Sequence, residues 1–207
     1  MRWLLLVLGV LTLAAASNGN DPQAWYRMGL GYDYGEGTEQ NHARALQWYL
    51  QAAEQGHIPA QVKAGDFFTL GTGSEVDLAE AAAWYRRAAE QGHVGAQQNL
   101  AAMYDSGRGV AQDLRQATEW YRRAAAQGAP NAQAWLGRAF ATGRGAVADP
   151  LLAYVWYSVA AVTSSGIEAR TAAANRDLAA TQLSPAKLAE AQERARVCTQ
   201  SGFKTCD

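Results

Sequence analysis

The chain has 207 residues, of which 49% are apolar and 18% charged, a balance typical of a folded globular protein and unlike that of a disordered one. Its 18 Lys and Arg residues nearly match its 19 Asp and Glu residues, and no long run of one sign occurs. This charge balance argues against binding to a nucleic-acid backbone or to an anionic membrane surface.

The first residues have the three parts of a secretory signal peptide. Arg2 supplies a positive charge, residues 4–13 form an apolar run, and Ala14 to Ala16 offer small side chains for cleavage. The alternative is a membrane anchor, but a spanning helix needs roughly 20 apolar residues and polar residues begin here at Ser17. The sequence therefore predicts a cleaved signal peptide over residues 1–16.

The chain has two cysteines, Cys198 and Cys206, both close to the C-terminus. In an oxidising compartment we expect them to form one disulfide that closes a small loop. The spacing differs from C-x-x-C, which argues against a redox-active pair. Free thiols, or thiols that bridge two chains, are the remaining states open to these two residues.

The sequence repeats itself with a period of 36 residues, which is the main clue to its fold. The clearest repeated feature is a Trp-Tyr pair at residues 48–49, 84–85, 120–121 and 156–157. An alanine position and a glycine position follow the same period: Ala24, Ala60, Ala96 and Ala132, and Gly35, Gly71, Gly107 and Gly143.

Each repeat divides into two predicted helices. In the third repeat, apolar residues recur at intervals of three to five over residues 95–106, which predicts a first helix that ends at Gly107. Asp113 is placed to cap the N–H groups of a second helix, and Gly128 is placed to end it.

Hairpins of this length cannot bury their apolar faces alone, but a row of them shares a continuous core. Each Trp ring can bury about 150 to 250 Å² in that core. The sequence therefore predicts an all-α fold, an α/α superhelical solenoid of four hairpins. A short segment at residues 17–23 precedes the hairpins, and capping helices at residues 167–207 follow them.

The third unit, AQQNLAAMYDSGRGVAQDLRQATEWYRRAAAQG at residues 96–128, resembles a Sel1-like repeat, a helical hairpin related to the tetratricopeptide repeat. The resemblance covers four units at residues 24–57, 60–93, 96–129 and 132–166. The fourth unit has Ser164 where the period predicts glycine, so we expect the stacking to change there, as it does at a terminal cap.

Candidate catalytic and ligand motifs have structural explanations. The G-x-G tripeptides lie between helices and lack the Lys-Ser and strand context of a nucleotide loop. His57 and His93 share a repeat position, but zinc needs further ligands and the next repeat has Ala129 there. We therefore expect no catalytic residue, no metal and no cofactor.

In relatives of this repeat, the first helix of each hairpin lines a concave face. The resemblance therefore implies partner binding by positions of that helix that lie off its packing stripe, and these positions vary between repeats. They are Tyr26, Leu30, Asp33, Tyr34, Val62, Asp66, Thr69, Gln98, Asp105 and Arg138. Tyr26, Leu30 and Tyr34 are the strongest candidates, because aromatic and leucine side chains are typical interface anchors. The alternatives are that such positions are merely solvated, or that these three are buried under the N-terminal segment.

The resemblance implies a non-catalytic adaptor or regulator in the periplasm of a Gram-negative bacterium, without a membrane span after signal cleavage. Its expected partner is a protein or peptide of the cell envelope, bound on the concave face. One alternative is an immunity protein that neutralises a toxin delivered to the periplasm. Another is an enzyme that acts on cell-wall material or β-lactams. The sequence does not identify the partner or the oligomeric state.

Overall fold

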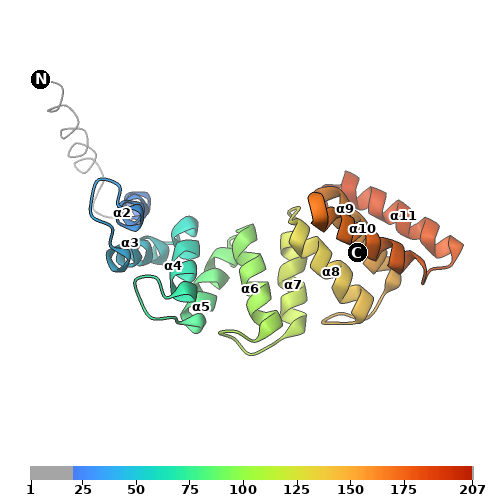
Figure 1. The fold of residues 1–207 in the computed structure, drawn as a ribbon, viewed down its shortest axis with the longest axis horizontal. Coiled ribbons are helices and arrows are strands. Elements are labelled where there is room, and N and C mark those ends of the chain that lie inside the picture. The colour runs from blue at the N-terminus through green and yellow to red at the C-terminus, as the bar shows by residue number, and fades with distance from the viewer. Residues whose placement is uncertain (1–20, 207) are drawn as a thin grey trace, which may run out of the picture. The chain divides into compact units, whose positions relative to one another are not determined.

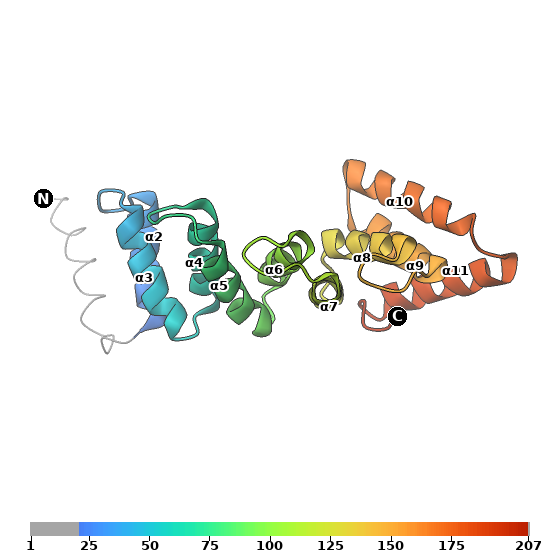
Figure 2. The same cartoon turned by 90° about the horizontal axis from the view of Figure 1, so that it is seen from below.

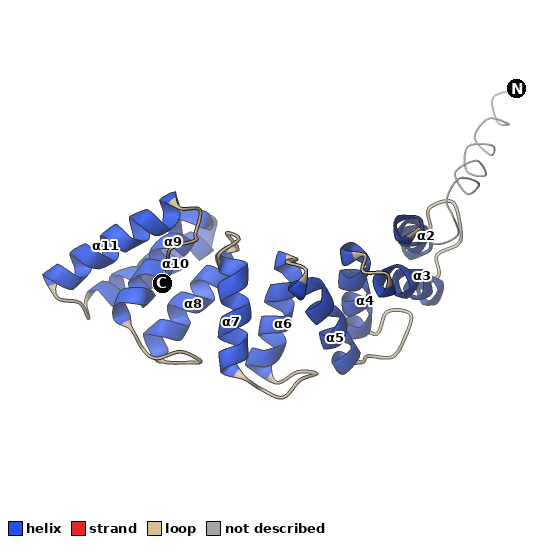
Figure 3. Ribbon diagram, turned by 180° about the vertical axis from the view of Figure 1, so that it is seen from behind, coloured by secondary structure: helices blue, strands red, loops and turns tan. Residues whose placement is uncertain are grey.

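The computed structural model describes residues 21–206, and every regular element in this range is a helix (Figure 3). The predicted signal peptide, residues 1–16, lies outside the described residues, as does most of the predicted segment at residues 17–23. No helix within residues 21–206 is long and apolar enough to cross a membrane.

The helices follow one another along the chain as hairpins (Figure 1). They are α2 (Pro22–Tyr34), α3 (His42–Glu54), α4 (Ile58–Leu70), α5 (Leu78–Glu90), α6 (Val94–Ser106), α7 (Leu114–Ala125), α8 (Pro130–Thr142), α9 (Pro150–Thr163), α10 (Gly166–Ala180) and α11 (Pro185–Gln200). The first eight form the four repeats, and the predicted helix at residues 95–106 corresponds to α6.

The chain divides into two compact units, with the boundary after Arg87. Within the described residues, the first unit holds α2, α3, α4 and most of α5. The second unit holds the end of α5 and all helices from α6 to α11.

Capping residues set the helix ends within each repeat. Asp113 Oδ1 accepts hydrogen bonds from the backbone N–H groups of Arg115 and Gln116 at 2.9 and 3.0 Å, which starts α7 as predicted. The first helices end at glycines with left-handed backbone, among them Gly71 (φ 69°) and Gly107 (φ 72°). Glycine favours this conformation because it has no Cβ to clash with the backbone.

The Trp-Tyr pairs lie in the core. All four tyrosines are buried, as are Trp84, Trp120 and Trp156, whereas Trp48 is half-buried. In the first unit, Trp25 and Trp84 pack with four alanines, Ala52, Ala53, Ala60 and Ala64. The small alanine side chains let neighbouring helices approach closely beside the large rings.

A buried glutamine joins successive repeats at the start of α4, α6 and α8. Gln61, Gln97 and Gln133 are 3%, 4% and 0% exposed. Their side-chain amides donate to the backbone carbonyls of Ala53, Ala89 and Ala125, at 3.1, 3.1 and 3.2 Å. Each of these carbonyls lies in the last turn of the preceding repeat's second helix and also accepts the N–H of the glycine three residues on, so the glutamine adds a second hydrogen bond that links the two repeats.

The C-terminal helices complete the second unit. After α9, Ser164 has extended backbone (φ −87°, ψ 177°) where the other repeats have a left-handed glycine. Both α10 and α11 pack against α9, and Figure 2 shows them as two arms joined by a short linker. Cys198 and Cys206 form a disulfide. Close to it, Phe203 packs beside Gly128 at the end of the third repeat.

Candidate functional site

Four of the predicted binding residues line one groove in the first unit, which we call the first groove. Its volume is about 390 Å³. It is lined by Asp33 and Tyr34 of α2, by Lys63, Asp66, Phe67, Thr69 and Leu70 of α4, and by Thr72 and Tyr85.

Tyr49 and Tyr85 bring their hydroxyl groups to the carboxylates at the groove because their rings cross over glycines of the first helices; Tyr85 itself lines the groove. A Cβ on Gly29 would lie 2.5 Å from Tyr49 Cδ1, and one on Gly65 would lie 2.6 Å from Tyr85 Cε1. Because the glycines leave this space free, each ring packs directly on the backbone of the helix beside it. The two hydroxyl groups thereby meet the carboxylates of α2 and α4.

Asp33 is the centre of the first polar network. It is 7% exposed and accepts a hydrogen bond from the Tyr49 hydroxyl at 3.0 Å. Lys63 Nζ donates to Asp33 at 3.0 Å and to the Tyr34 hydroxyl at 3.1 Å, and His42 Nδ1 lies 3.3 Å from Asp33 Oδ1. The Asp33 carboxylate is therefore already paired within the chain.

Burial and these bonds change the acidity of the groups involved. Burial, aided by the carboxylate of Asp33, raises the pKa of Tyr49 well above its ordinary value. Partial burial lowers the pKa of Lys63, but its bonds to Tyr34 and Asp33 outweigh this effect and raise the pKa overall. Tyr49 thus stays neutral and Lys63 stays charged near neutral pH.

Asp66 and Tyr85 form a second carboxylate–phenol pair, in which the Tyr85 hydroxyl donates to Asp66 Oδ1 at 2.7 Å. Thr69 Oγ1 lies 3.4 Å from the same hydroxyl and donates to the Gly65 carbonyl at 2.7 Å. No Lys, Arg or His within residues 21–206 forms an ion pair with Asp66.

The other predicted residues of the first unit have different environments. Tyr26 is half-buried, and its ring lies 5.6 Å from that of Tyr49 and 4.8 Å from that of His57. Leu30 is half-buried and packs against the core around Tyr49. Val62 is half-buried on α4. Of the three strongest candidates, Tyr34 alone is largely exposed, at 59%.

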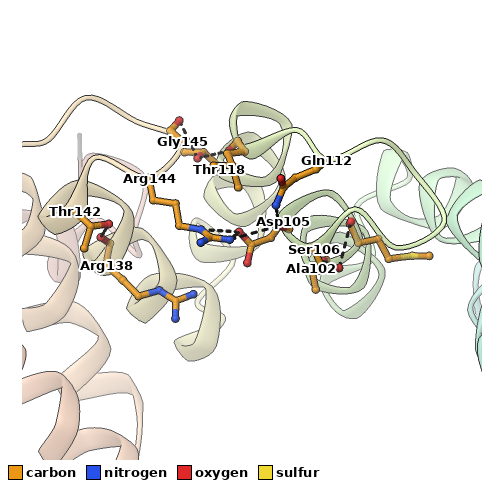
Figure 4. A network of polar contacts seen from close by, with 11 residues as sticks. Ala102, Asp105, Ser106, Gln112, Thr118, Arg138, Thr142, Arg144 and Gly145 are labelled. Atoms are coloured by element: carbon orange, nitrogen blue, oxygen red, sulfur yellow. Dashed lines mark hydrogen bonds and ion pairs between the residues drawn. The ribbon is translucent and has the colours of Figure 1, made fainter.

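In the second unit, the Asp105 carboxylate already forms an ion pair within the chain. Arg144 binds its carboxylate at 2.9 Å, and Gln112 donates to its backbone carbonyl at 2.8 Å (Figure 4). In Figure 4 no dashed line joins the guanidinium of Arg138 to this network. Arg138 instead lines a second groove of about 440 Å³, with Trp135 of α8 and Ile167 of α10. Gln98 is half-buried on α6.

Five residues that line the first groove were absent from the predicted set: Lys63, Phe67, Leu70, Thr72 and Tyr85. Leu70 is 73% exposed and lies 36 residues after Tyr34, so the repeat period could have identified it. Lys63 occupies a position that changes in every repeat, being Arg27, Lys63, Asn99 and Trp135. Variation at one repeat position was the available signal for Lys63.

The paired histidines cap helices. His57 Nδ1 accepts a hydrogen bond from the Ala60 N–H at 3.2 Å, and His93 Nδ1 accepts one from the Ala96 N–H at 3.1 Å. Histidine is not among the usual N-cap residues, so this role is hard to predict from residue type alone. Within residues 21–206, no three His, Cys, Asp or Glu side chains gather as metal ligands do.

Comparison with known proteins identifies the repeat. The model of the Sel1 repeat family matches residues 22–57, 58–93, 94–128 and 130–161. These matches begin at the first residues of α2, α4, α6 and α8. The chain belongs to the Sel1 repeat family.

Solved Sel1 repeat proteins share this fold. One is a Sel1 repeat protein from Oxalobacter formigenes, with 39% identity and a TM-score of 0.65, covering 69% of this chain and 57% of that one. Another is a protective antigen of uropathogenic Escherichia coli with an SLR fold, with 30% identity and a TM-score of 0.69, covering 82% of this chain and 40% of that one. The predicted resemblance and the all-α solenoid fold class are therefore confirmed.

This chain spans about half the length of these two structures, 57% and 40%. No curated protein sequence matches it. Sel1 repeats mediate protein interactions, and their fold is typically a non-catalytic scaffold.

Proposed function

We propose that this Sel1 repeat protein is a non-catalytic binding module of the periplasm that recognises a protein or peptide of the cell envelope through the first groove. The observation that carries the proposal is the pair Tyr34 and Leu70, which are 59% and 73% exposed and both line this groove. They end two successive first helices at corresponding repeat positions. Large side chains left exposed beside a groove are typical of sites that bind another protein.

The polar groups of the groove suit binding better than catalysis. Lys63 is held by Asp33 and by the Tyr34 hydroxyl, and its pKa is raised, which disfavours a role as a general base. The Tyr49 hydroxyl is held by Asp33, and its pKa is also raised. These groups fix the shape and charge of the groove.

Two features support a periplasmic location. The disulfide between Cys198 and Cys206 is typical of proteins in oxidising compartments. The apolar run at residues 4–13, behind Arg2, has the composition of an export signal.

Site-specific photo-crosslinking in cells tests the proposal. The photoreactive amino acid p-benzoylphenylalanine replaces Tyr34 or Leu70 in the full chain, and crosslinked products are identified by mass spectrometry. Val162, which is 71% exposed on α9 and lies outside the first groove, provides the matched control position.

We expect one envelope protein to be crosslinked from positions 34 and 70 and not from position 162. If the same protein is crosslinked from all three positions, the first groove is excluded as the binding site. The same holds if no protein is crosslinked from positions 34 and 70 although the chain is folded. The identity of the protein separates an envelope component from a toxin that enters the periplasm.

A further inference from the structure

We propose that the first groove recognises a basic side chain of its partner, a lysine or arginine, and that Asp66 is the residue that binds it. This inference rests on the proposed function and adds the chemistry of the partner. It comes from a comparison of the two carboxylate–phenol pairs in the same groove, one of which already holds a cation.

The first pair shows how the groove accommodates a basic side chain. The Asp33 carboxylate binds the Tyr49 hydroxyl and the Lys63 ammonium, both at 3.0 Å. The same ammonium lies 5.1 Å from the centre of the Tyr34 ring and 5.7 Å from the centre of the Tyr49 ring. A carboxylate and two electron-rich ring faces thus surround the cation, and both attract positive charge.

The second pair has the same two groups, a carboxylate and a phenol, but its carboxylate has no basic partner within residues 21–206. Tyr85 corresponds to Tyr49 in the repeat, and its hydroxyl donates to Asp66 at 2.7 Å. The repeat position that supplies Lys63 to the first pair is the neutral Asn99 one repeat later. Among the described residues, no basic group forms an ion pair with Asp66, so its charge is left for a partner to neutralise.

The surroundings of Asp66 suit a long basic side chain. Asp66 is partly exposed, unlike the buried Asp33, so its carboxylate is open to the groove. Leu70, one turn further along α4, is 73% exposed. Lysine and arginine carry an apolar stem below the charged group, and such a stem can pack on Leu70 while the charge meets Asp66.

The charge of the lining favours the same ligand. Two carboxylates, Asp33 and Asp66, face one ammonium, Lys63. One negative charge is therefore left over among these three groups. An acidic partner would be repelled by this charge, and an apolar partner would leave Asp66 unpaired beneath it.

Selection from a random peptide library displayed on phage tests the inference with a defined probe. The full chain and its Asp66→Asn variant are used as baits, and the enriched peptides are sequenced and synthesised. Asparagine can still accept the Tyr85 hydrogen bond through its side-chain oxygen, so the variant keeps the local structure. Circular dichroism confirms folding, and Glu75→Gln, which removes an exposed carboxylate outside the groove lining, is the matched control.

We expect peptides enriched on the full chain to share a lysine or arginine. Their affinity should fall about tenfold on Asp66→Asn, which is the scale of one charge-assisted hydrogen bond at a partly exposed site. Replacing the basic residue of the peptide by citrulline or norleucine should have a similar effect. Glu75→Gln should leave the affinity unchanged.

The outcomes separate this inference from the proposed function. Two outcomes overturn the role of Asp66 but leave the groove as a binding site. In the first, the enriched peptides need Tyr34 and Leu70 for binding but share no basic residue. In the second, they bind Asp66→Asn as well as they bind the original chain. Peptides whose binding is unaffected by Tyr34→Ala and Leu70→Ala overturn the proposed function itself.

Discussion

The Tyr49 ring lies so close to Gly29 that a Cβ at position 29 would come within 2.5 Å of Tyr49 Cδ1. Tyr49 is fully buried and cannot swing away, so Gly29→Ala forces a clash. We expect a loss of about 1 to 3 kcal/mol in the free energy of unfolding. Urea denaturation measures this loss.

Gly31 in the same helix provides the control. A Cβ there would meet the Glu36 carbonyl oxygen at 3.5 Å, an ordinary contact. Gly31→Ala should therefore stabilise the protein by about 0.5 to 1 kcal/mol, because alanine loses less conformational entropy in a helix than glycine does. Equal effects of the two substitutions would contradict the role assigned to Gly29.

Gln133→Leu tests the buried glutamine that joins the third and fourth repeats. The substitution leaves the Ala125 carbonyl without its 3.2 Å hydrogen bond and removes the acceptor for Thr163 Oγ1 at 2.6 Å. The Ala125 carbonyl keeps the Gly128 N–H at 2.9 Å, and Thr163 Oγ1 keeps the Val159 carbonyl at 3.0 Å. We therefore expect the ordinary net cost of lost hydrogen bonds, about 0.5 to 1.5 kcal/mol in unfolding free energy. Gln192→Leu, at an exposed position of α11, should change the stability by less than about 0.5 kcal/mol.

Trp84→Ala tests the contribution of the Trp-Tyr pairs to the core. Trp84 is 7% exposed and packs with Trp25 and alanines of α3 and α4. We expect a loss of about 3 to 5 kcal/mol in unfolding free energy, as for other large-to-small core substitutions. Trp48→Ala should cost less because Trp48 is half-buried. The reverse order in denaturant titrations would contradict the deeper burial of Trp84.

The His57 cap predicts a dependence of stability on pH. Burial lowers the pKa of His57 below its ordinary value of 6.5, and its Nδ1 must be unprotonated to accept from the Ala60 N–H. The unfolded chain then binds a proton more readily than the folded one. The contribution of His57 to the free energy of unfolding is therefore fully present above about pH 6.5, the pKa in the unfolded chain. It is lost as the pH falls toward and through the lower pKa of the folded chain.

Unfolding free energies measured between about pH 8 and about pH 5 check this expectation. His57→Asn is the comparison, because asparagine is a good N-cap and does not titrate in this range. The variant should show a smaller loss of stability on acidification. Identical pH profiles for the two proteins would exclude a contribution from the His57 cap.

The disulfide should hold the tail and leave the repeats largely independent of it. Cys198 and Cys206 close a short loop, in which the Phe203 N–H donates to the Cys198 carbonyl at 2.9 Å. Replacing both cysteines by serine should increase amide hydrogen exchange at residues 201–206, because the loop is no longer closed. Amides of α4 should exchange as before. Unchanged protection of the tail would show that packing alone holds it.

The sequence predicted the repeats and their helices because those features depend on local and periodic signals. The 36-residue spacing of the Trp-Tyr pairs identifies the unit, and a capping residue such as Asp113 marks where a helix begins. Both kinds of signal act within one hairpin or repeat along the chain, so they can be read without coordinates. The family match and the solved structures confirm this part of the prediction.

The sequence could place the candidate binding residues on the first helices, but it could not predict how deeply each side chain is buried. Tyr26 and Leu30 ranked beside Tyr34 by residue type, yet they are half-buried, whereas Tyr34 is exposed. For a side chain beside the apolar face of its helix, the exposed fraction depends on how closely the next helix approaches. That distance is set by packing, for example by the space that Gly29 leaves for Tyr49.

By itself, then, the sequence determined that this is a helical repeat protein and which residues form its recurring core, because regular spacing dictates regular packing. The tertiary structure alone decided which charged groups are already paired. Lys63 meets Asp33 from 30 residues away, and Arg144 meets Asp105 from 39 residues away, whereas Asp66 has the Tyr85 hydroxyl and no cation among the described residues. The reason is that an ion pair requires two side chains within about 4 Å of each other, and for residues so far apart in sequence this distance is set by the folding of one repeat against the next.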